Sequence, residues 1–387
     1  MRTPVKKVLK SKLSFFTISH GLVHTITGSL APILPLIRSE FNLSYTLIGA
    51  LTLLSSLTLG IASIPAGVIS DRVNRLKFVS LMFMLIGILC ALVLLATKLW
   101  IIILLFSSLF LCFSIFHPSA QVSLFYEYSC KRGSTFGIYE SGGNFGMFLA
   151  PILAGFIGSK FGWRSVYGIW SVPAIIIALL AWFKSAEKGT KNYIYNSNKP
   201  FTKEIFHWIR FVLAHQELRS IFIIQGIFGL LWAVVVFIPL FLVDKRGFSV
   251  EGAGLILALF LLGGVVGKIM GGKLCDKWGK KKVIISCFSL LGLFYPLIPF
   301  IFGFTLILVF LASSVIFFMI VPVLLTSVAD FTQEGLGFNY GLLTLMGASF
   351  GSISRLFSGI ISDIWGMEVI FFMFSIIALA GAVFSFF

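Results

Sequence analysis

Long apolar stretches, each ended by a short polar break, follow one another along the whole chain. A helix needs about 20 residues to cross the hydrocarbon core of a bilayer. Twelve stretches approach or exceed that length: 14–36, 45–69, 78–97, 99–123, 134–158, 164–183, 218–243, 252–272, 283–302, 304–327, 337–361 and 367–386. The pattern therefore predicts an all-α integral membrane protein with 12 transmembrane helices.

Composition agrees with a membrane protein and argues against an enzyme. Hydrophobic residues make up 58% of the 387 residues, and only 11% are charged. A soluble domain carries about 25% charged residues. The twelve stretches and their connections use the whole chain, so no separate catalytic domain fits. We expect neither enzyme activity nor a cofactor.

The basic residues are distributed unevenly between the two sides of the predicted bundle. If the amino terminus is cytoplasmic, 23 of the 30 Lys and Arg residues fall in cytoplasmic segments, with Lys268 counted in the loop after the eighth stretch. Such an excess of basic residues marks the cytoplasmic side. We expect a multi-pass protein of the plasma or inner membrane with both termini cytoplasmic. The net charge of +16 then faces anionic lipid rather than nucleic acid.

The second half of the chain repeats the first. A polar turn formed by Gly67, Asp71, Arg72, Arg75 and Lys77 returns 205 residues later as Gly272, Asp276, Lys277, Gly279, Lys280 and Lys281. Repeats of this kind are typical of transporters whose halves move against each other. We predict an N-terminal six-helix bundle over 1–183 and a C-terminal one over 218–387. Between them, 184–217 is predicted to be a cytoplasmic linker with an amphipathic helix.

These paired turns resemble the loop between the second and third spans of the major facilitator superfamily. The second copy matches that motif fully, whereas the first has Asn74 where glycine is usual. The resemblance implies two pseudo-symmetric six-helix bundles and a cavity lined by spans one, four, seven and ten. It also implies that the turns close the inner side, with Gly67 and Gly272 allowing close helix approach. A narrower resemblance, through 116–120 and 141–146, is to the fosmidomycin-resistance group of exporters.

Polar residues inside the apolar stretches are the candidate solute or proton pathway. A charge at mid-bilayer costs at least about 2.5–3.5 kcal/mol, so such residues are functional candidates by default. They are His20, His24, His117, Gln121, Glu140, Asn144, Gln225 and Arg355. Histidine suits proton exchange, and Glu140 is either a proton carrier or a partner for the basic loops. Arg355 either holds an anion, extends outward to the membrane surface, or pairs with Asp363 or Asp244.

The histidines and the five cysteines are scattered along the sequence, and neither set predicts a metal site or a disulfide. Because no ATP-binding motif is present, an ion or solute gradient must supply the energy. We predict a monomeric secondary active transporter of a small organic solute, preferably anionic, coupled to protons and embedded in lipid. The exporter resemblance favours efflux. The alternatives are an uncoupled uniporter, a transporter-like sensor or scaffold without flux, and a polytopic membrane enzyme.

Overall fold

The computed structural model describes residues 4–127, 132–186, 201–331 and 336–385, and these residues form helices and short connections. The first half contains α1 (Pro4–Gly28), α2 (Leu30–Phe41), α3 (Tyr45–Arg72), α4 (Arg75–Val93), α5 (Leu99–Glu127), α6 (Arg132–Phe161) and α7 (Trp163–Ala186). After α8 (Phe201–Ala214) come α9 (Gln216–Leu231), α10 (Ala233–Arg246), α11 (Val250–Trp278), α12 (Lys280–Phe294), the 3₁₀ helix η1 (Tyr295–Phe300), α13 (Gly303–Phe331), α14 (Leu336–Trp365) and α15 (Val369–Phe384).

Two of the crossings consist of two helices each. The break between α1 and α2 falls at Ser29, and the break between α9 and α10 falls at Trp232, the corresponding place in the second half. With α1–α2 and α9–α10 each counted once, the described helices make the twelve predicted crossings. Among the residues that the structure describes, ten helical stretches are long and apolar enough to cross a membrane. The other two crossings are α15, which is apolar but short, and α14, which carries Arg355 and Asp363.

The two halves repeat each other in atomic detail, which confirms the predicted pair of pseudo-symmetric bundles. The His20 ring on α1 fills the space that a side chain at Gly143 on α6 would need. In the second half, Gln225 on α9 fills the equivalent space at Gly347 on α14. Ser44 accepts a hydrogen bond at the start of α3, and Ser249 does the same for α11.

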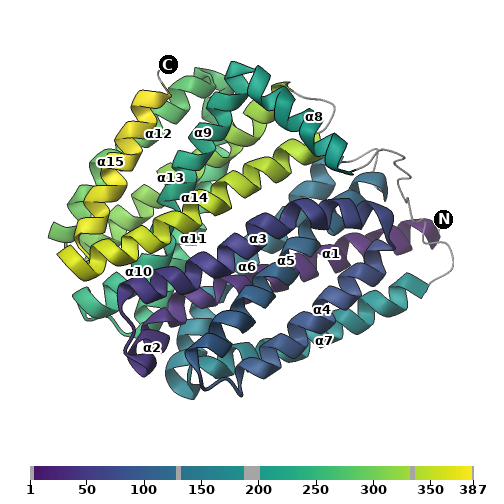
Figure 1. Cartoon of the computed structure of the whole chain (residues 1–387), viewed down its shortest axis with the longest axis horizontal. Helices are drawn as coiled ribbons and strands as arrows, with labels where there is room; N and C mark the ends of the chain where they lie inside the picture. Colours follow the sequence, from purple (N-terminus) through teal and green to yellow (C-terminus); the bar gives the residue numbers. More distant parts are fainter. Residues whose placement is uncertain (1–3, 128–131, 187–200, 332–335, 386–387) are drawn as a thin grey trace.

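Three helix pairs form the main contacts between the halves, and α2 also contacts α11. α3 packs against α14, α6 against α11, and α2 against α10. α8 and the start of α1 lie at one end of the bundle, whereas α2 and the end of α10 lie at the other, which we call the far end (Figure 1). Backbones approach closely at these contacts, which we call the seams between the halves. A β-carbon at Gly49 would lie 2.4 Å from the Arg355 carbonyl oxygen. A β-carbon at Gly254 would lie 2.4 Å from the carbonyl oxygen of Pro151, the equivalent position in the first half.

The expected role of Gly272 in close helix approach is wrong. A β-carbon at Gly272 would meet nothing within 4 Å. The tight position is one residue earlier, where a β-carbon at Gly271 would lie 2.3 Å from the carbonyl oxygen of Met319 on α13. A shift of one residue turns a helix face by about 100°, since a turn takes 3.6 residues.

A matched pair of glycine substitutions tests this packing. A β-carbon at Gly146 on α6 would lie 2.1 Å from the Gly21 carbonyl oxygen on α1. We expect Gly146→Ala to destabilise the protein by about 1–3 kcal/mol, because overpacking forces two backbones apart. Gly272→Ala, which meets open space, should leave the unfolding temperature in detergent unchanged or slightly raised. Equal melting temperatures for the two variants would contradict the predicted packing.

Candidate functional site

A central cavity of about 160 Å³ lies between the two halves. It is lined from the first half by His24, Thr27, Gly28, Leu30, Ala31, Leu34, Thr52, Ser56, Phe110 and Met147. The second half contributes Trp232, Val235, Val236, Leu257, Leu261 and Arg355. Both helix breaks therefore border the cavity. Interrupted helices near a binding site are a recurring feature of secondary transporters, because they place backbone groups where a solute can reach them.

Arg355 is the charged side chain of this cavity. From α14 it crosses to α3, where it donates hydrogen bonds to the Ser56 hydroxyl and, at 3.4 Å, to the Thr52 carbonyl oxygen. Its Nε is buried and has no hydrogen-bond partner among the described residues. The carboxylates of Asp363 and Asp244, considered as partners from the sequence, bind elsewhere. Within the described part of the chain, the guanidinium thus has only neutral partners.

Three of the predicted residues form a histidine cluster: His20, His24 and His117. The ring centres of His20 and His24 are 4.7 Å apart, and those of His24 and His117 are 5.4 Å apart. His20 is buried, whereas His24 lines the central cavity. The expectation that the histidines are scattered is therefore wrong for these three. The reason is that α1 and α5 both contact α6, which brings residues almost a hundred positions apart onto facing surfaces.

Lys268 was wrongly assigned to a cytoplasmic loop. It lies inside α11, ten residues before that helix ends at Trp278, and its ammonium group donates a 3.0 Å hydrogen bond to Asn144 Oδ1 on α6. Glu140, one turn before Asn144 on the same helix, interacts electrostatically with Lys268. The structure therefore brings Glu140 and Asn144 to a cation of the opposite half, at the seam between α6 and α11.

Two other predicted residues lie away from the cavity lining. Gln225 packs against Gly347, so its side chain occupies the seam between α9 and α14. Gln121 is exposed on α5, one turn beyond His117. Neither is among the residues that line the central cavity.

The far end of the bundle is closed by contacts between the halves. The Asp363 carboxylate on α14 accepts hydrogen bonds from the backbone N–H groups of Tyr45 and Thr46, at 2.8 and 2.7 Å. These are the first two donors of α3, which have no partner within their own helix. The Ser44 hydroxyl accepts from the third donor, at Leu47. A residue of the second half thus helps to cap a helix of the first.

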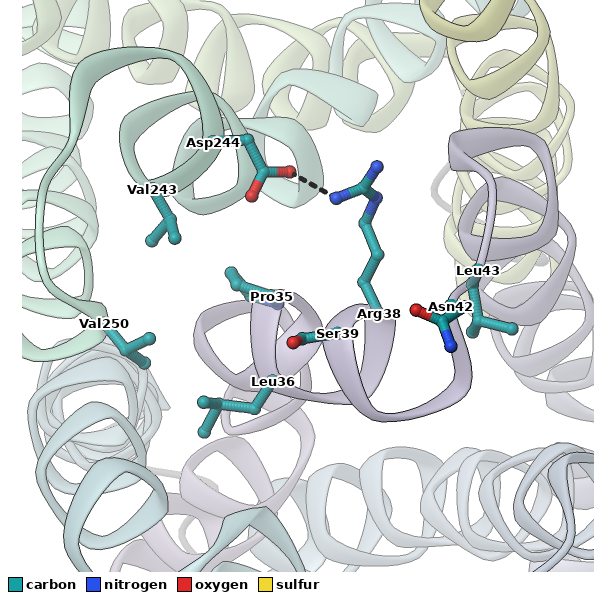
Figure 2. Close-up of a pocket in the computed structure, with 9 residues that line it drawn as sticks. All are labelled: Pro35, Leu36, Arg38, Ser39, Asn42, Leu43, Val243, Asp244 and Val250. Carbon is teal, nitrogen blue, oxygen red and sulfur yellow. Dashed lines mark hydrogen bonds and ion pairs between the residues drawn. The ribbon is translucent and has the colours of Figure 1, made fainter.

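A second contact lies beside this cap, next to a hollow of about 520 Å³ (Figure 2). Arg38 on α2 pairs with Asp244 on α10, as the dashed line in Figure 2 marks. The nitrogen and the oxygen of this pair are 3.1 Å apart. The Tyr45 hydroxyl donates to the same carboxylate oxygen at 2.9 Å, and the Arg38 guanidinium lies 4.1 Å from the centre of the Tyr45 ring. We call Arg38, Tyr45, Asp244 and Asp363 the outer contact, a name that follows the orientation we propose for the chain.

The polar turns lie at the other ends of α3 and α11, away from the outer contact. Asp276 is exposed, and no hydrogen bond or ion pair of the described residues involves it. Lys280 donates to the Thr326 carbonyl oxygen within its own half, and Lys77 lies 5.8 Å from the Trp182 ring. Of Asp71 and Arg72 only the backbone, at the end of α3, is described.

Asn74, which departs from the family motif, has a structural role of its own. Its side chain accepts a hydrogen bond from the Lys77 N–H and so caps α4. Gly279 at the equivalent place has a φ of 83° and makes no side-chain cap. The two copies therefore begin their next helix by different means, and Asn74 needs no left-handed backbone because its φ is −67°.

The fold and the sequence identify the class of protein together. The sequence profile of the Major Facilitator Superfamily matches residues 16–250 and 221–387, so the chain belongs to this family of membrane transporters. It is 26% identical over 381 residues to the fosmidomycin resistance protein of Escherichia coli (strain K12), which covers 95% of the chain and 90% of that protein. It is 24% identical to a probable sugar efflux transporter of Helicobacter acinonychis (strain Sheeba), covering 77% of the chain and 73% of the relative.

Solved structures show the same fold. A bacterial homologue of the human lysosomal transporter Spinster, in an inward-facing and unoccupied conformation, superimposes with a TM-score of 0.81 at 17% identity, covering 100% of this chain and 97% of the other. A mutant of the nucleoside transporter NupG gives a TM-score of 0.79 at 14% identity, covering 98% of this chain and 99% of the other. The chain is thus a multi-pass membrane transporter, as its sequence predicts.

Proposed function

We propose that this transporter moves a small organic anion by alternating access through the central cavity. The observation that carries the proposal is Arg355, a guanidinium in the cavity whose hydrogen bonds go only to neutral groups among the described residues. A buried charge without a counterion is costly. A carboxylate, phosphate or phosphonate in the cavity would offset that cost and match the planar fork of the side chain. Trp232 and Phe110 would contact the apolar part of the solute.

The outer contact and the exposed Asp276 support an inward-facing state. We propose that both termini are cytoplasmic, so that the far end of the bundle is the outer side. The bundles predicted at 1–183 and 218–387 would then rock until the outer contact opens and the inner turns close, with Asp71 and Asp276 meeting cations of the opposite half. We propose efflux as the direction, since two relatives are named for resistance and for sugar efflux.

We propose that protons drive this transport and that Glu140 carries them. Glu140 interacts with Lys268, a cation of the other half. When Glu140 binds a proton, its attraction for Lys268 is lost, and one electrostatic contact between α6 and α11 goes with it. Protonation would therefore weaken the contact between α6 and α11, which must loosen when the two halves rock. An ion gradient can favour one of two conformations in this way.

The test is flux in proteoliposomes with and without an imposed pH gradient. Fosmidomycin, simple carboxylates and phosphonates, and neutral sugars are the solutes to screen. We expect an anion to be transported and a proton gradient to drive its accumulation. An unchanged flux would favour the uniporter, and the absence of flux for every solute would favour a sensor or scaffold.

Glu140→Gln tests the proposed proton carrier. The variant keeps the shape of the side chain but cannot release a proton, so we expect gradient-driven accumulation to fall at least tenfold. Exchange of labelled for unlabelled solute needs no net proton movement, and it should continue. Glu217→Gln, at the exposed start of α9, is the matched control. Accumulation by Glu140→Gln at the wild-type level would rule out this residue as the carrier.

A further inference from the structure

The histidine cluster has the composition and the geometry of a transition-metal site. Each of the three rings offers one nitrogen, and these three nitrogens lie within 4.8 Å of one another. Imidazole is the usual protein ligand of zinc, cobalt, nickel and copper ions. We propose that His20, His24 and His117 bind a divalent ion of this class, with Zn²⁺ as the reference case. This inference depends on neither the solute nor the direction of transport.

The neighbours of His20 fix its ring in the orientation and the tautomer that a metal ligand needs. Its Nδ1 lies 2.9 Å from the Tyr139 carbonyl oxygen, and because a carbonyl only accepts, Nδ1 carries the proton and donates it. Nε2 is then the nitrogen with a free lone pair. Metal-binding histidines almost always donate their other nitrogen in this way, which fixes ring and tautomer. The ring also stacks on Tyr139, with centres 4.1 Å apart.

Gly143 makes room for this arrangement. A β-carbon at that position would lie 2.5 Å from the His20 ring, so a side chain there would displace the ring. His20 is thus enclosed by α6 on two sides, through Tyr139 and Gly143. One ligand is preorganised before any ion arrives, which lowers the cost of binding.

The other two ligands have room to close around an ion. With Zn–N bonds of about 2.0–2.1 Å, a tetrahedral ion holds its nitrogens roughly 3.4 Å apart, which is less than the 4.8 Å within which the three nitrogens now lie. His24 and His117 are only partly buried, so small side-chain rotations can close that gap. Three histidines leave the fourth tetrahedral position open. His24 lines the central cavity, so an open position on the His24 side of the ion would be accessible to water or to an oxygen of a bound solute.

Nearby charges limit the affinity of the histidine cluster for a divalent ion. The three imidazoles are neutral ligands and supply no negative charge. Lys268 lies within electrostatic range of His20 and His24 and disfavours a second cation, whereas Glu140 partly offsets it. We therefore expect reversible binding rather than a permanently held structural ion.

The test is Co²⁺ binding to the purified full-length protein in detergent, prepared without a polyhistidine tag. Tetrahedral Co²⁺ absorbs visible light far more strongly than the hydrated ion, and Zn²⁺ should displace it. We expect one equivalent per chain. His24→Gln and His117→Gln should each weaken binding at least ~10-fold, since even the groups that orient metal ligands contribute 10–100-fold. His215→Gln, whose ring bonds the Phe211 carbonyl outside the cluster, should bind as the wild type does.

Size-exclusion chromatography and the unfolding temperature without metal establish that the variants fold. Addition of Zn²⁺ should raise the unfolding temperature of the wild type and of His215→Gln, but not that of His24→Gln or His117→Gln. Absence of a tetrahedral Co²⁺ spectrum in the wild type would overturn the proposal and leave the cluster as a set of proton-binding or packing histidines. Binding that survives both cluster variants at full strength would overturn it as well, since the ion would then lie elsewhere.

Discussion

Arg355→Gln is expected to weaken binding of a small organic anion by about 10- to 100-fold. The estimate follows from the loss of hydrogen bonds to a charged group, worth about 1.5–3 kcal/mol, because each 1.4 kcal/mol is a factor of ten. The buried Nε has no partner among the described residues and is free to take part. The measurement is stabilisation of the detergent-purified protein by the best anion found in the flux screen. Binding of a neutral sugar should not change.

Two controls separate charge from geometry. Arg355→Lys keeps the positive charge but loses the planar fork, so we expect an intermediate loss. Arg219→Gln removes an exposed arginine at the start of α9 and should have no effect. If Arg355→Gln binds the anion as tightly as the wild type, Arg355 does not hold the solute. A preference for neutral sugars in the wild type would likewise argue against an anionic solute.

Asp363→Asn is expected to open the far end of the bundle. The carboxylate caps two backbone donors of α3 across the seam, at 2.8 and 2.7 Å. The amide has a single oxygen and no charge, so the cap should lose about 1–2 kcal/mol in this partly exposed place. The population open to the outer side should then rise about 5- to 30-fold. An Ala31→Cys label site in the central cavity reports this as faster reaction with an impermeant thiol reagent added outside.

The chain supplies a matched control for this variant. Ser165 at the start of α7 also lies at this end of the bundle, and its hydroxyl donates to the Phe161 carbonyl oxygen within the first half. Ser165→Ala should leave the labelling rate of Ala31→Cys unchanged. Equal labelling rates in Asp363→Asn and the parent protein would show that this cap does not hold the outer side closed.

The fold could be predicted because two strong signals agree. Long apolar stretches fix the number of crossings, and the repeated polar turn fixes their division into two bundles. The helix breaks at Ser29 and Trp232 were not predicted. A single residue between two apolar helices leaves the hydrophobic stretch unbroken, so the hydropathy of the sequence does not reveal the helix break.

The candidate site could be predicted only in part. Residue type and depth single out His24 and Arg355. Lys268 was misplaced because it was counted with the basic residues that follow it, although it lies within the predicted stretch 252–272 and within α11. Partners across the halves, such as Asp363 with the start of α3, depend on how two separate bundles pack. No periodicity within one helix encodes that packing, so these pairs emerge only from the structure.

Locking the outer ends together tests alternating access most directly. Ser39 and Val243 face the hollow at the outer contact from opposite halves (Figure 2), and both can be changed to cysteine in a chain without its native cysteines. We predict that a short, reducible thiol cross-linker between them abolishes flux in proteoliposomes, that reduction restores it, and that each single cysteine is unaffected. Undiminished flux through the cross-linked protein would contradict the central claim that the two halves must separate at this end for the solute to cross.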